Sequence, residues 1–322
     1  MRDESGANQG SWVHRRPAPC RIRAVVVHYG PTELVEACVR SLVDFAPGIE
    51  IVVVDHGDAP LSATWNYGPG DGISIVRPAV NSGYGSGCNA GALGCTREFL
   101  LFLNNDVALL EGSVDALVNA LDENVQATIA APLLVDETGR SLPSVHRLPS
   151  PWRLLMENVP VGRLFPFVRG LEGNNSVRQP GPRQCEVEAI LGAAFLVRRT
   201  EFEKVGGFDE GFFHYVEEDD LFRRMRDRDR RIVFVPEAHI VHCGLGASQD
   251  ISLPIRDRWK VDGFLRYAAK HHGGRGRRRT YCSLFLGAQI RLLMARMTRS
   301  GTAVSRKERF RQLVQYLRSI QP

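Results

Sequence analysis

The chain has 322 residues, of which 43% are hydrophobic and 24% charged, with a formal net charge of +5 at pH 7. This is the composition of a globular protein with a full hydrophobic core. No stretch reaches the roughly 18 uninterrupted apolar residues of a membrane-spanning helix, and the polar first twenty residues lack the apolar core of a secretory signal. The sequence therefore argues against an integral membrane protein and a secreted one.

The seven cysteines are scattered, odd in number and contain no C-x-x-C pair. This pattern indicates reduced thiols and argues against a disulfide framework or a zinc site. We therefore expect a cytoplasmic protein, either free or at the cytoplasmic face of the membrane.

Charge divides the chain into two parts. From Arg256 to the end there are 17 Lys or Arg and 3 Asp or Glu, a net charge of +14, whereas the first 255 residues carry a net charge of −9. An acidic body thus precedes a strongly basic C-terminal segment.

The N-terminal part predicts alternating strands and helices. After a disordered leader at 1–20, the apolar runs 22–27 and 51–54 predict buried strands, and apolar spacing over 34–45 predicts a helix between them. Strand, helix and strand form the βαβ unit of a parallel sheet. Asp55 ends the second strand, where it could bind a ribose or base, or cap a turn.

A glycine-rich segment follows a predicted loop at 59–72 and a short strand at 73–76. Residues 81–91 contain four glycines among small polar residues, ahead of a helical run. Such a loop lets the backbone approach a ligand, and a helix N-terminus favours phosphate. The segment is neither a Walker loop nor a G-x-G-x-x-G motif, so a glycine-rich turn without a ligand is an equal alternative.

The run 99–103 is apolar without alternation, which predicts a strand buried on both faces. It ends in Asn104, Asn105 and Asp106, and ligands bind at this end of the strands in open α/β sheets. Their oxygens suit a hard divalent cation, and such a cation suits a diphosphate. The alternative is a polar turn. A helix at 113–121, capped by Ser113, and a strand at 127–131 follow.

Residues 136–183 are rich in Pro, Gly and Arg, and we expect short helices and a mobile loop on the acceptor side. The apolar run 187–197 contains Gly192 and Ala193, whose small size indicates either close approach of a ligand or simple packing.

A row of four carboxylates, 217–220, follows an aromatic run and opens a helix. Acidic residues complement a helix N-terminus, but four in succession exceed that need. Crowded like charges raise at least one pKa, which suits a general base. A strand at 231–235 then leads to His239 and His242, which point to opposite faces of an extended chain, so we expect only one of them to be a ligand.

In this order the chain contains VVVHYG, IVVVDHGD, the segment 81–91, LFLNND, ILGAAFLVRR, VGGFDEGFF with EEDDL, and VPEAHIVH. The ensemble, over residues 21–247, resembles the inverting glycosyltransferases of family 2, and most of all the bacterial rhamnosyltransferases that act on lipid-linked glycans. The resemblance implies a GT-A fold, an α/β architecture with a Rossmann-like, mostly parallel sheet flanked by helices. We expect a glycosyltransferase domain at 21–250 and a basic helical extension at 251–322.

The resemblance also implies the donor site. Asp106 matches the main metal ligand, for Mg²⁺ or Mn²⁺, and His242 matches a histidine that approaches the metal and the diphosphate. Asp55 matches the residue that binds the nucleoside. The residues expected to bind the nucleotide sugar are His28, Tyr29, Asp55, Asn81, Gly83, Tyr84, Gly87, Asn89, Asn104 and Asn105.

On the acceptor side the resemblance implies roles for Gly192, Ala193 and Asp220. Glu218 stands where the family usually has a catalytic Asp, so the base could be Glu218, Glu217 or Asp219. A second departure is Gly30, where the first strand of the family more often ends in Asn.

The implied activity is inverting transfer of a sugar, best matched by rhamnose from dTDP-rhamnose, to a hydroxyl of a glycan or polyprenyl-linked acceptor. One alternative is a catalytically inactive nucleotide-sugar-binding partner of such an enzyme, which the departure at Glu218 would favour. Another is a sugar-1-phosphate nucleotidyltransferase, but no Lys or Arg follows the first strand to bind a triphosphate.

The C-terminal segment admits two interpretations. Residues 281–297 are amphipathic, with Leu284, Phe285, Leu286 and Leu292 among the apolar residues, and follow an Arg cluster at 275–279. A basic helix with an apolar face suits peripheral contact with an anionic membrane. The alternative is a helical pair packed on the body. We expect no nucleic acid partner, because no recognised binding motif accompanies the charge.

Overall fold

The computed structural model describes residues 18–61, 72–159, 180–244, 251–297 and 302–320. Most of the predicted leader and parts of the predicted loops at 59–72 and 136–183 lie outside these ranges. The strands are β1 (Ile22–His28), β2 (Glu50–Asp55), β3 (Ile73–Val76), β4 (Phe99–Asn104), β5 (Val107–Leu109), β6 (Ala127–Val135), β7 (Val145–His146), β8 (Cys185–Val187), β9 (Ala189–Ile190), β10 (Ala194–Arg198) and β11 (Arg231–His242). The helices are η1 (Ala18–Arg21), α1 (Thr32–Phe45), α2 (Tyr84–Ala92), α3 (Ser113–Glu123), α4 (Pro151–Asn158), α6 (Arg199–Lys204), α7 (Glu217–Arg226), α8 (Leu253–Met297) and α9 (Thr302–Ser319).

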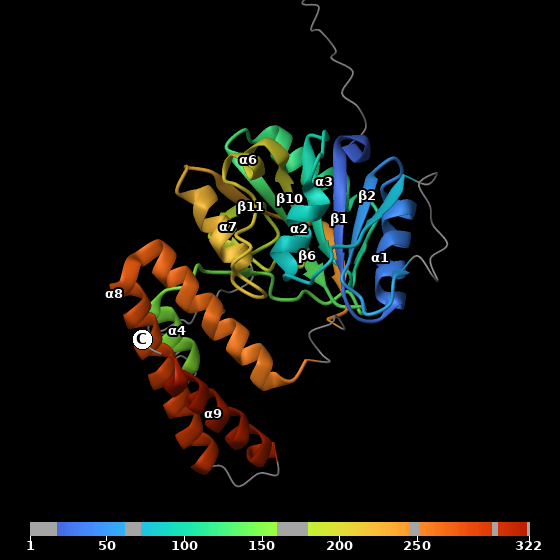
Figure 1. Ribbon diagram of the computed structural model, residues 1–322. Coiled ribbons are helices and arrows are strands. Elements are labelled where there is room, and N and C mark those ends of the chain that lie inside the picture. The colour runs from blue at the N-terminus through green and yellow to red at the C-terminus, as the bar shows by residue number, and fades with distance from the viewer. Residues whose placement is uncertain (1–17, 62–71, 160–179, 245–250, 298–301, 321–322) are drawn as a thin grey trace, which may run out of the picture.

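Within these ranges, nine strands form one sheet in the order β3-β2-β1-β4-β10-β6-β11-β5, with β8 beside β11, and helices cover it (Figure 1). β1, β2, β3 and β4 run parallel, as the βαβ pattern predicts. β10 runs antiparallel between β4 and β6, so the far half of the sheet is mixed. The predicted α/β class with helices on both faces is confirmed.

The continuous apolar strands are explained by cores on both faces of the sheet. One face packs on α1 and α3 through residues such as Leu42 and Leu117. The other packs on α2, α6 and α7 through residues such as Phe202 and Phe222. A strand between two helical layers buries every side chain, which is why alternation is absent from β4.

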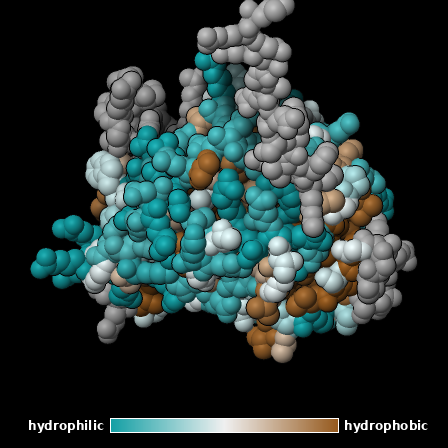
Figure 2. Space-filling view, turned by 90° about the horizontal axis from the view of Figure 1, so that it is seen from above, coloured by the Kyte–Doolittle hydropathy of each residue, from teal (hydrophilic) through white to brown (hydrophobic). Residues whose placement is uncertain are grey.

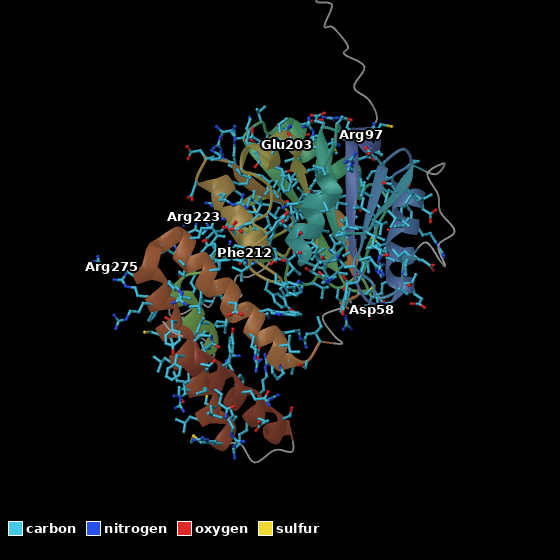
Figure 3. All side chains as sticks on the ribbon, in the orientation of Figure 1. Asp58, Arg97, Glu203, Phe212, Arg223 and Arg275 are labelled. Atoms are coloured by element: carbon cyan, nitrogen blue, oxygen red, sulfur yellow. The ribbon has the colours of Figure 1, made fainter. Side chains whose placement is uncertain are left out.

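β1, β2 and β4 end at the same edge of the sheet. Figure 3 makes their direction visible: Arg97, just before β4, lies at one end of the body, and Asp58, just after β2, lies at the other. The unit made by α4, α8 and α9 lies at the end where these strands stop (Figure 1).

The glycine-rich segment differs from the prediction. The helix α2 begins at Tyr84, so Gly85, Gly87 and Gly91 are helical and do not form a loop. A Cβ on Gly91 would lie 2.3 Å from Val25 Cγ1, and one on Gly87 would lie 2.9 Å from Val27 Cγ1. These two glycines therefore permit close packing of α2 on β1.

The predicted cap of α3 is also wrong. Gly112, at φ 77°, takes the cap position, and the Ser113 hydroxyl donates to backbone carbonyls of Leu110 and His239. Ser113 thus ties the start of α3 to β11.

The C-terminal segment forms a bent helix and a return helix. Gly273, with φ 66° and ψ −170°, interrupts α8 between arms at 253–272 and 274–297. Leu284 and Leu292, which the sequence placed on an exposed apolar face, are instead buried with α9 and α4. Packing thus accounts for part of the amphipathic pattern. No helix of the described ranges has the length and apolar character to cross a bilayer.

α8 is joined to α7 through a buried carboxylate. Asp220 is fully buried and lies 2.8 Å from Arg224 Nε, His271 Nε2 and Lys270 Nζ. Burial opposes its ionisation, but the hydrogen bond from His271 and the charges of Arg224 and Lys270 outweigh it and hold its pKa below the ordinary value.

We predict that Asp220→Asn lowers the free energy of unfolding by about 3–5 kcal/mol at neutral pH, because it leaves buried cations without their counter-charge. The matched control, Asp227→Asn, removes the half-exposed partner of Arg223 and costs less than about 1 kcal/mol. Urea unfolding measures both. Because the pKa of Asp220 is depressed, its contribution is present above the ordinary value of 3.8 and fades as the pH falls below it. Equal losses in the two variants would contradict this role.

Candidate active site

A cleft of about 770 Å³ opens where β1 and β4 end, between the body and the first arm of α8. Its walls come from segments that are far apart in the sequence: the strand ends, the start of α2, the turn before β10, the approach to α7, the end of β11 and the start of α8. Of the residues that the sequence singled out, the cleft is lined by Tyr29, Asn81, Gly83, Tyr84, Asn104, Asn105, Asp106, Gly192, Ala193, Glu217, Glu218 and His242.

One corner of the cleft has a donor set suited to a hard cation. Asp106 Oδ2 lies 3.5 Å from His242 Nε2, although β4 and β11 are far apart in the sequence. Asn105 donates to the Tyr29 carbonyl at 2.9 Å and fixes the tip of β4 beside β1. The described residues contain no cluster of three or more His, Cys, Asp or Glu that could hold a metal alone. This pair therefore fits a cation whose other ligands are phosphate oxygens and water, as is usual for Mg²⁺.

The cleft is also lined by two carboxylates, Glu217 and Glu218. Glu218 packs against Gly192, and a Cβ added to Gly192 would lie 3.2 Å from Glu218 Oε1. The Tyr84 hydroxyl donates to the Gly192 carbonyl at 3.1 Å and closes this corner. Burial and the charge of Asp219 raise the pKa of Glu218 to about 7. Burial and the charge of Glu218 raise the pKa of Glu217 well above its ordinary value. A carboxyl that titrates near neutrality can accept a proton there.

Asp219 turns away from the cleft to a histidine that the sequence reasoning missed. His146 Nε2 lies 2.7 Å from Asp219 Oδ1, and both side chains are largely buried. Burial lowers the pKa of His146, but the negative charge of Asp219 and the hydrogen bond to it outweigh burial, so the pKa is raised overall. His146 belongs to β7, which pairs with β9 just before Gly192. Its positive charge lowers the pKa of the neighbouring Glu218.

The carboxylate row is introduced by a strained turn. Tyr215 and Val216 have φ of 70° and 72°, a region that a β-branched residue such as Val rarely adopts. A Cβ on Gly263 of α8 would lie 2.9 Å from the Tyr215 carbonyl oxygen, so α8 presses on this turn. Val216 also packs with Phe212 and Tyr267. Such strain persists where the surroundings enforce it, often at functional sites.

Several expected site residues lie behind the cleft. Asp55 accepts hydrogen bonds from the amides of Gly57 and Leu61 and from Arg77 Nη1 at 2.6 Å, so its carboxylate organises the loop after β2. The side-chain amide of Asn89 donates hydrogen bonds to the Phe208 carbonyl and the Glu210 carboxylate. The other expected residues that do not line the cleft are His28, Gly87, Asp219 and Asp220. The structure therefore does not expose these six residues to the cleft, and exposure does not support the binding or catalytic roles expected of them.

The apolar wall was not predicted. The rings of Phe213 and Trp259 lie 4.9 Å apart, and Ile255 and Leu191 also line the cleft. The aromatic run before 217 was a usable signal for Phe213. Trp259 carried none, because it lies in the C-terminal segment, outside the expected catalytic domain. His56 also lines the cleft, and burial lowers its pKa.

Comparison with known proteins places this geometry in context. A family model described as "Glycosyl transferase family 2" matches residues 24–175, and one described as "N-terminal domain of galactosyltransferase" matches residues 176–243. The N-acetylglucosaminyl-diphospho-decaprenol L-rhamnosyltransferase of Mycobacterium tuberculosis is 30% identical over 235 residues, which cover 68% of this chain and 74% of the relative. Rhamnosyltransferase WbbL of Escherichia coli is 24% identical over 259 residues, 76% of this chain and 92% of the relative.

Solved structures share the fold. The mannosyltransferase PcManGT from Pyrobaculum calidifontis, in complex with GDP-Man and Mn²⁺, superposes with a TM-score of 0.53 at 12% identity, over 92% of this chain and 85% of that one. GalNAc-T7 with UDP, GalNAc and Mn²⁺ superposes with a TM-score of 0.53 at 14% identity, over 79% and 51%.

We predict that Gly83→Ala disrupts the cleft. Gly83 has φ 101°, and a Cβ on it would lie 1.8 Å from the Phe213 carbonyl oxygen, so the start of α2 and the segment at Phe213, which both line the cleft, must move apart. Gly94→Ala is the matched control, because Gly94 also has a positive φ, 66°, but nothing lies within 4 Å of its Cβ position. The control should cost about 1 kcal/mol in urea unfolding and Gly83→Ala several-fold more. Similar costs would contradict a steric conflict between a side chain at position 83 and the Phe213 carbonyl.

Proposed function

Because this chain belongs to glycosyltransferase family 2, in its rhamnosyltransferase-like subgroup, we propose that the cleft transfers a sugar from a nucleotide-diphosphate donor to an acceptor hydroxyl. One observation carries the proposal. The cation-compatible pair Asp106 and His242 and the carboxylates Glu217 and Glu218 line the same cleft, although they come from three separate elements.

The donor side is assigned to the strand ends. Asp106 and His242 would hold a divalent cation, Mg²⁺ or Mn²⁺, together with the donor diphosphate. When bound, the cation neutralises the charge that develops on the departing diphosphate. Tyr29, Asn81, Tyr84 and the amides of Asn104 and Asn105 supply hydrogen-bonding groups around the nucleotide sugar.

Glu218 is the proposed general base. As a carboxylate it takes the proton from the acceptor hydroxyl while the hydroxyl oxygen forms the new bond to the anomeric carbon. The bond from that carbon to the diphosphate oxygen breaks on the opposite side, so a single displacement inverts the configuration. Glu217 is the second candidate, because burial and the charge of Glu218 raise its pKa well above the ordinary value. Asp219 is already paired with His146.

The names of the relatives support a proposal for the sugar and the acceptor. Two of them carry rhamnosyltransferase names, and one name includes an N-acetylglucosaminyl-diphospho-decaprenol acceptor. We therefore propose rhamnose from dTDP-rhamnose as the donor sugar, and a glycan on a polyprenyl diphosphate as the acceptor, reached at the cytoplasmic face of the membrane. Phe213 and Trp259 form an apolar wall suited to the face of an acceptor sugar ring.

We propose residues 21–250 as the glycosyltransferase domain and 251–322 as the extension. Ile255 and Trp259 of the extension line the cleft, so the extension would complete the acceptor side of the site.

The donor assignment predicts metal-dependent binding. Calorimetric titration of dTDP-rhamnose, GDP-mannose and UDP-N-acetylglucosamine, with and without Mn²⁺, should give one preferred donor that binds more tightly with the metal. Asp106→Asn should weaken metal-dependent binding at least about tenfold, because it removes the anionic ligand. The exposed Asp44→Asn is the control. If no donor binds, the transferase assignment fails. If a donor binds but is never transferred, the inactive-partner alternative takes its place.

The base assignment predicts a pH effect. Glu218→Gln should lower kcat on the order of 10²–10⁴-fold. For the unaltered protein, the rate should rise with pH through the pKa of Glu218 near 7, because only the carboxylate accepts the proton. His146→Gln removes a positive charge that lowers this pKa, so its acidic limb should move to higher pH and its rate should recover in part there. If His146→Gln lowered kcat by the same factor at every pH, His146 would have a structural role only.

A further inference from the structure

The second arm of α8 carries exposed side chains along one line. Arg275, Arg278, Arg279, Cys282, Leu286, Leu293 and Met297 are exposed and recur at intervals of three, four or seven residues. These intervals place them on one side of the helix. We call this set the outer stripe. It begins with three arginines at the bend and continues with apolar residues toward the end of the arm.

Folding of the hairpin does not account for the outer stripe. The core between α8, α9 and α4 uses the other side of the arm, where Leu284, Ala288 and Leu292 are buried. Leu286, Leu293 and Met297 remain 49%, 58% and 77% exposed. A helix that is apolar on its packed side usually has polar residues on the other. The apolar residues here need a different explanation.

The second arm of α8 carries charged side chains of one sign only. There is no Asp or Glu between Asp262 and Glu308, a run that includes the whole second arm. Within the described ranges, no salt bridge involves Arg275, Arg278 or Arg279, and Arg275 points away from the rest of the molecule (Figure 3). The stripe can therefore bind an anionic surface without first breaking ion pairs.

We propose that the outer stripe lies on the surface of an anionic lipid bilayer, with Leu286, Leu293 and Met297 among the upper acyl chains and the arginines at the phosphates. An apolar line flanked by unpaired arginines, with no acidic residue, matches this partner in both chemistry and charge. A protein partner would be met by mixed charges at the rim of the patch. Figure 2, which views the molecule from above relative to Figure 1, shows a mostly hydrophilic face with hydrophobic side chains gathered toward one edge.

Docking by this stripe would hold the cleft near the headgroups. The first arm of α8 lines the cleft, and the second arm continues from it through the bend at Gly273. This inference goes beyond the proposed function and does not depend on it, because lipid binding is measured without donor or acceptor.

The test is co-sedimentation of the full chain with vesicles of phosphatidylglycerol and phosphatidylcholine, compared with phosphatidylcholine alone. We expect binding to the anionic vesicles that weakens with added salt. Leu293→Ser/Met297→Ser should weaken it roughly tenfold or more. Arg275→Gln/Arg278→Gln/Arg279→Gln should weaken it about fivefold per arginine.

Matched controls distinguish vesicle binding by the outer stripe from nonspecific effects of exposed apolar side chains and of net positive charge. Leu93→Ser/Val125→Ser removes two exposed apolar side chains of the body, which are 82% and 80% exposed. Arg40→Gln/Arg140→Gln/Arg228→Gln removes three exposed arginines outside the C-terminal unit. Both controls should bind vesicles like the unaltered chain, and all variants should retain donor binding.

Three results would overturn the proposal: no binding to anionic vesicles, equal weakening in the controls, or a dimer in light scattering that Leu293→Ser/Met297→Ser converts to a monomer. The last would assign the stripe to a second copy of the chain. None of these affects donor titration, so failure of the docking surface and failure of the transferase assignment are distinguishable.

Discussion

The structure depends on placing four consecutive carboxylates in the first turn of α7. A helix N-terminus favours negative charge, but buried neighbouring charges repel one another. The fold gives each a separate environment: Asp220 meets Arg224, Lys270 and His271 of α7 and α8, Asp219 meets His146, and Glu217 and Glu218 face the cleft. Glu217 and Glu218 have raised pKa values, whereas the pKa of Asp220 is lowered, and this distinguishes the structural carboxylate Asp220 from the proposed base.

The C-terminal helices belong to this arrangement. Lys270 and His271 of α8 bind Asp220, and Gly263 presses on the strained turn that precedes the carboxylates. The same arm places Trp259 in the cleft wall. One arm of α8 thus fixes the acidic turn and shapes the proposed acceptor side, while the other carries the outer stripe. This arrangement links catalysis and proposed membrane contact through one helix bent at Gly273.

The sequence predicted what depends on local pattern. The apolar runs that became β1, β2 and β4 were placed to within a residue or two, because strands buried on both faces have an unmistakable composition. Asp106 was singled out because it follows such a run, and Glu218 because it belongs to a row of four carboxylates at the start of a helix. His146 was missed because its partner Asp219 lies 73 residues away, and nothing local marks the pair. The glycines of α2 were misread because their neighbours, the valines of β1, are known only once the helix is packed. Leu284 and Leu292 were placed on an exposed face because one helix cannot reveal which of its two apolar lines has a partner.

The most direct test of the central claim is transfer itself. The full chain would be incubated with its tightest-binding nucleotide sugar, Mn²⁺ and an N-acetylglucosaminyl-diphospho-polyprenol analogue, and the product analysed by NMR. We predict acceptor-dependent release of the nucleoside diphosphate and a glycoside of inverted anomeric configuration, both lost in Glu218→Gln. A product of retained configuration, or full transfer by Glu218→Gln, would contradict a single displacement driven by this carboxylate.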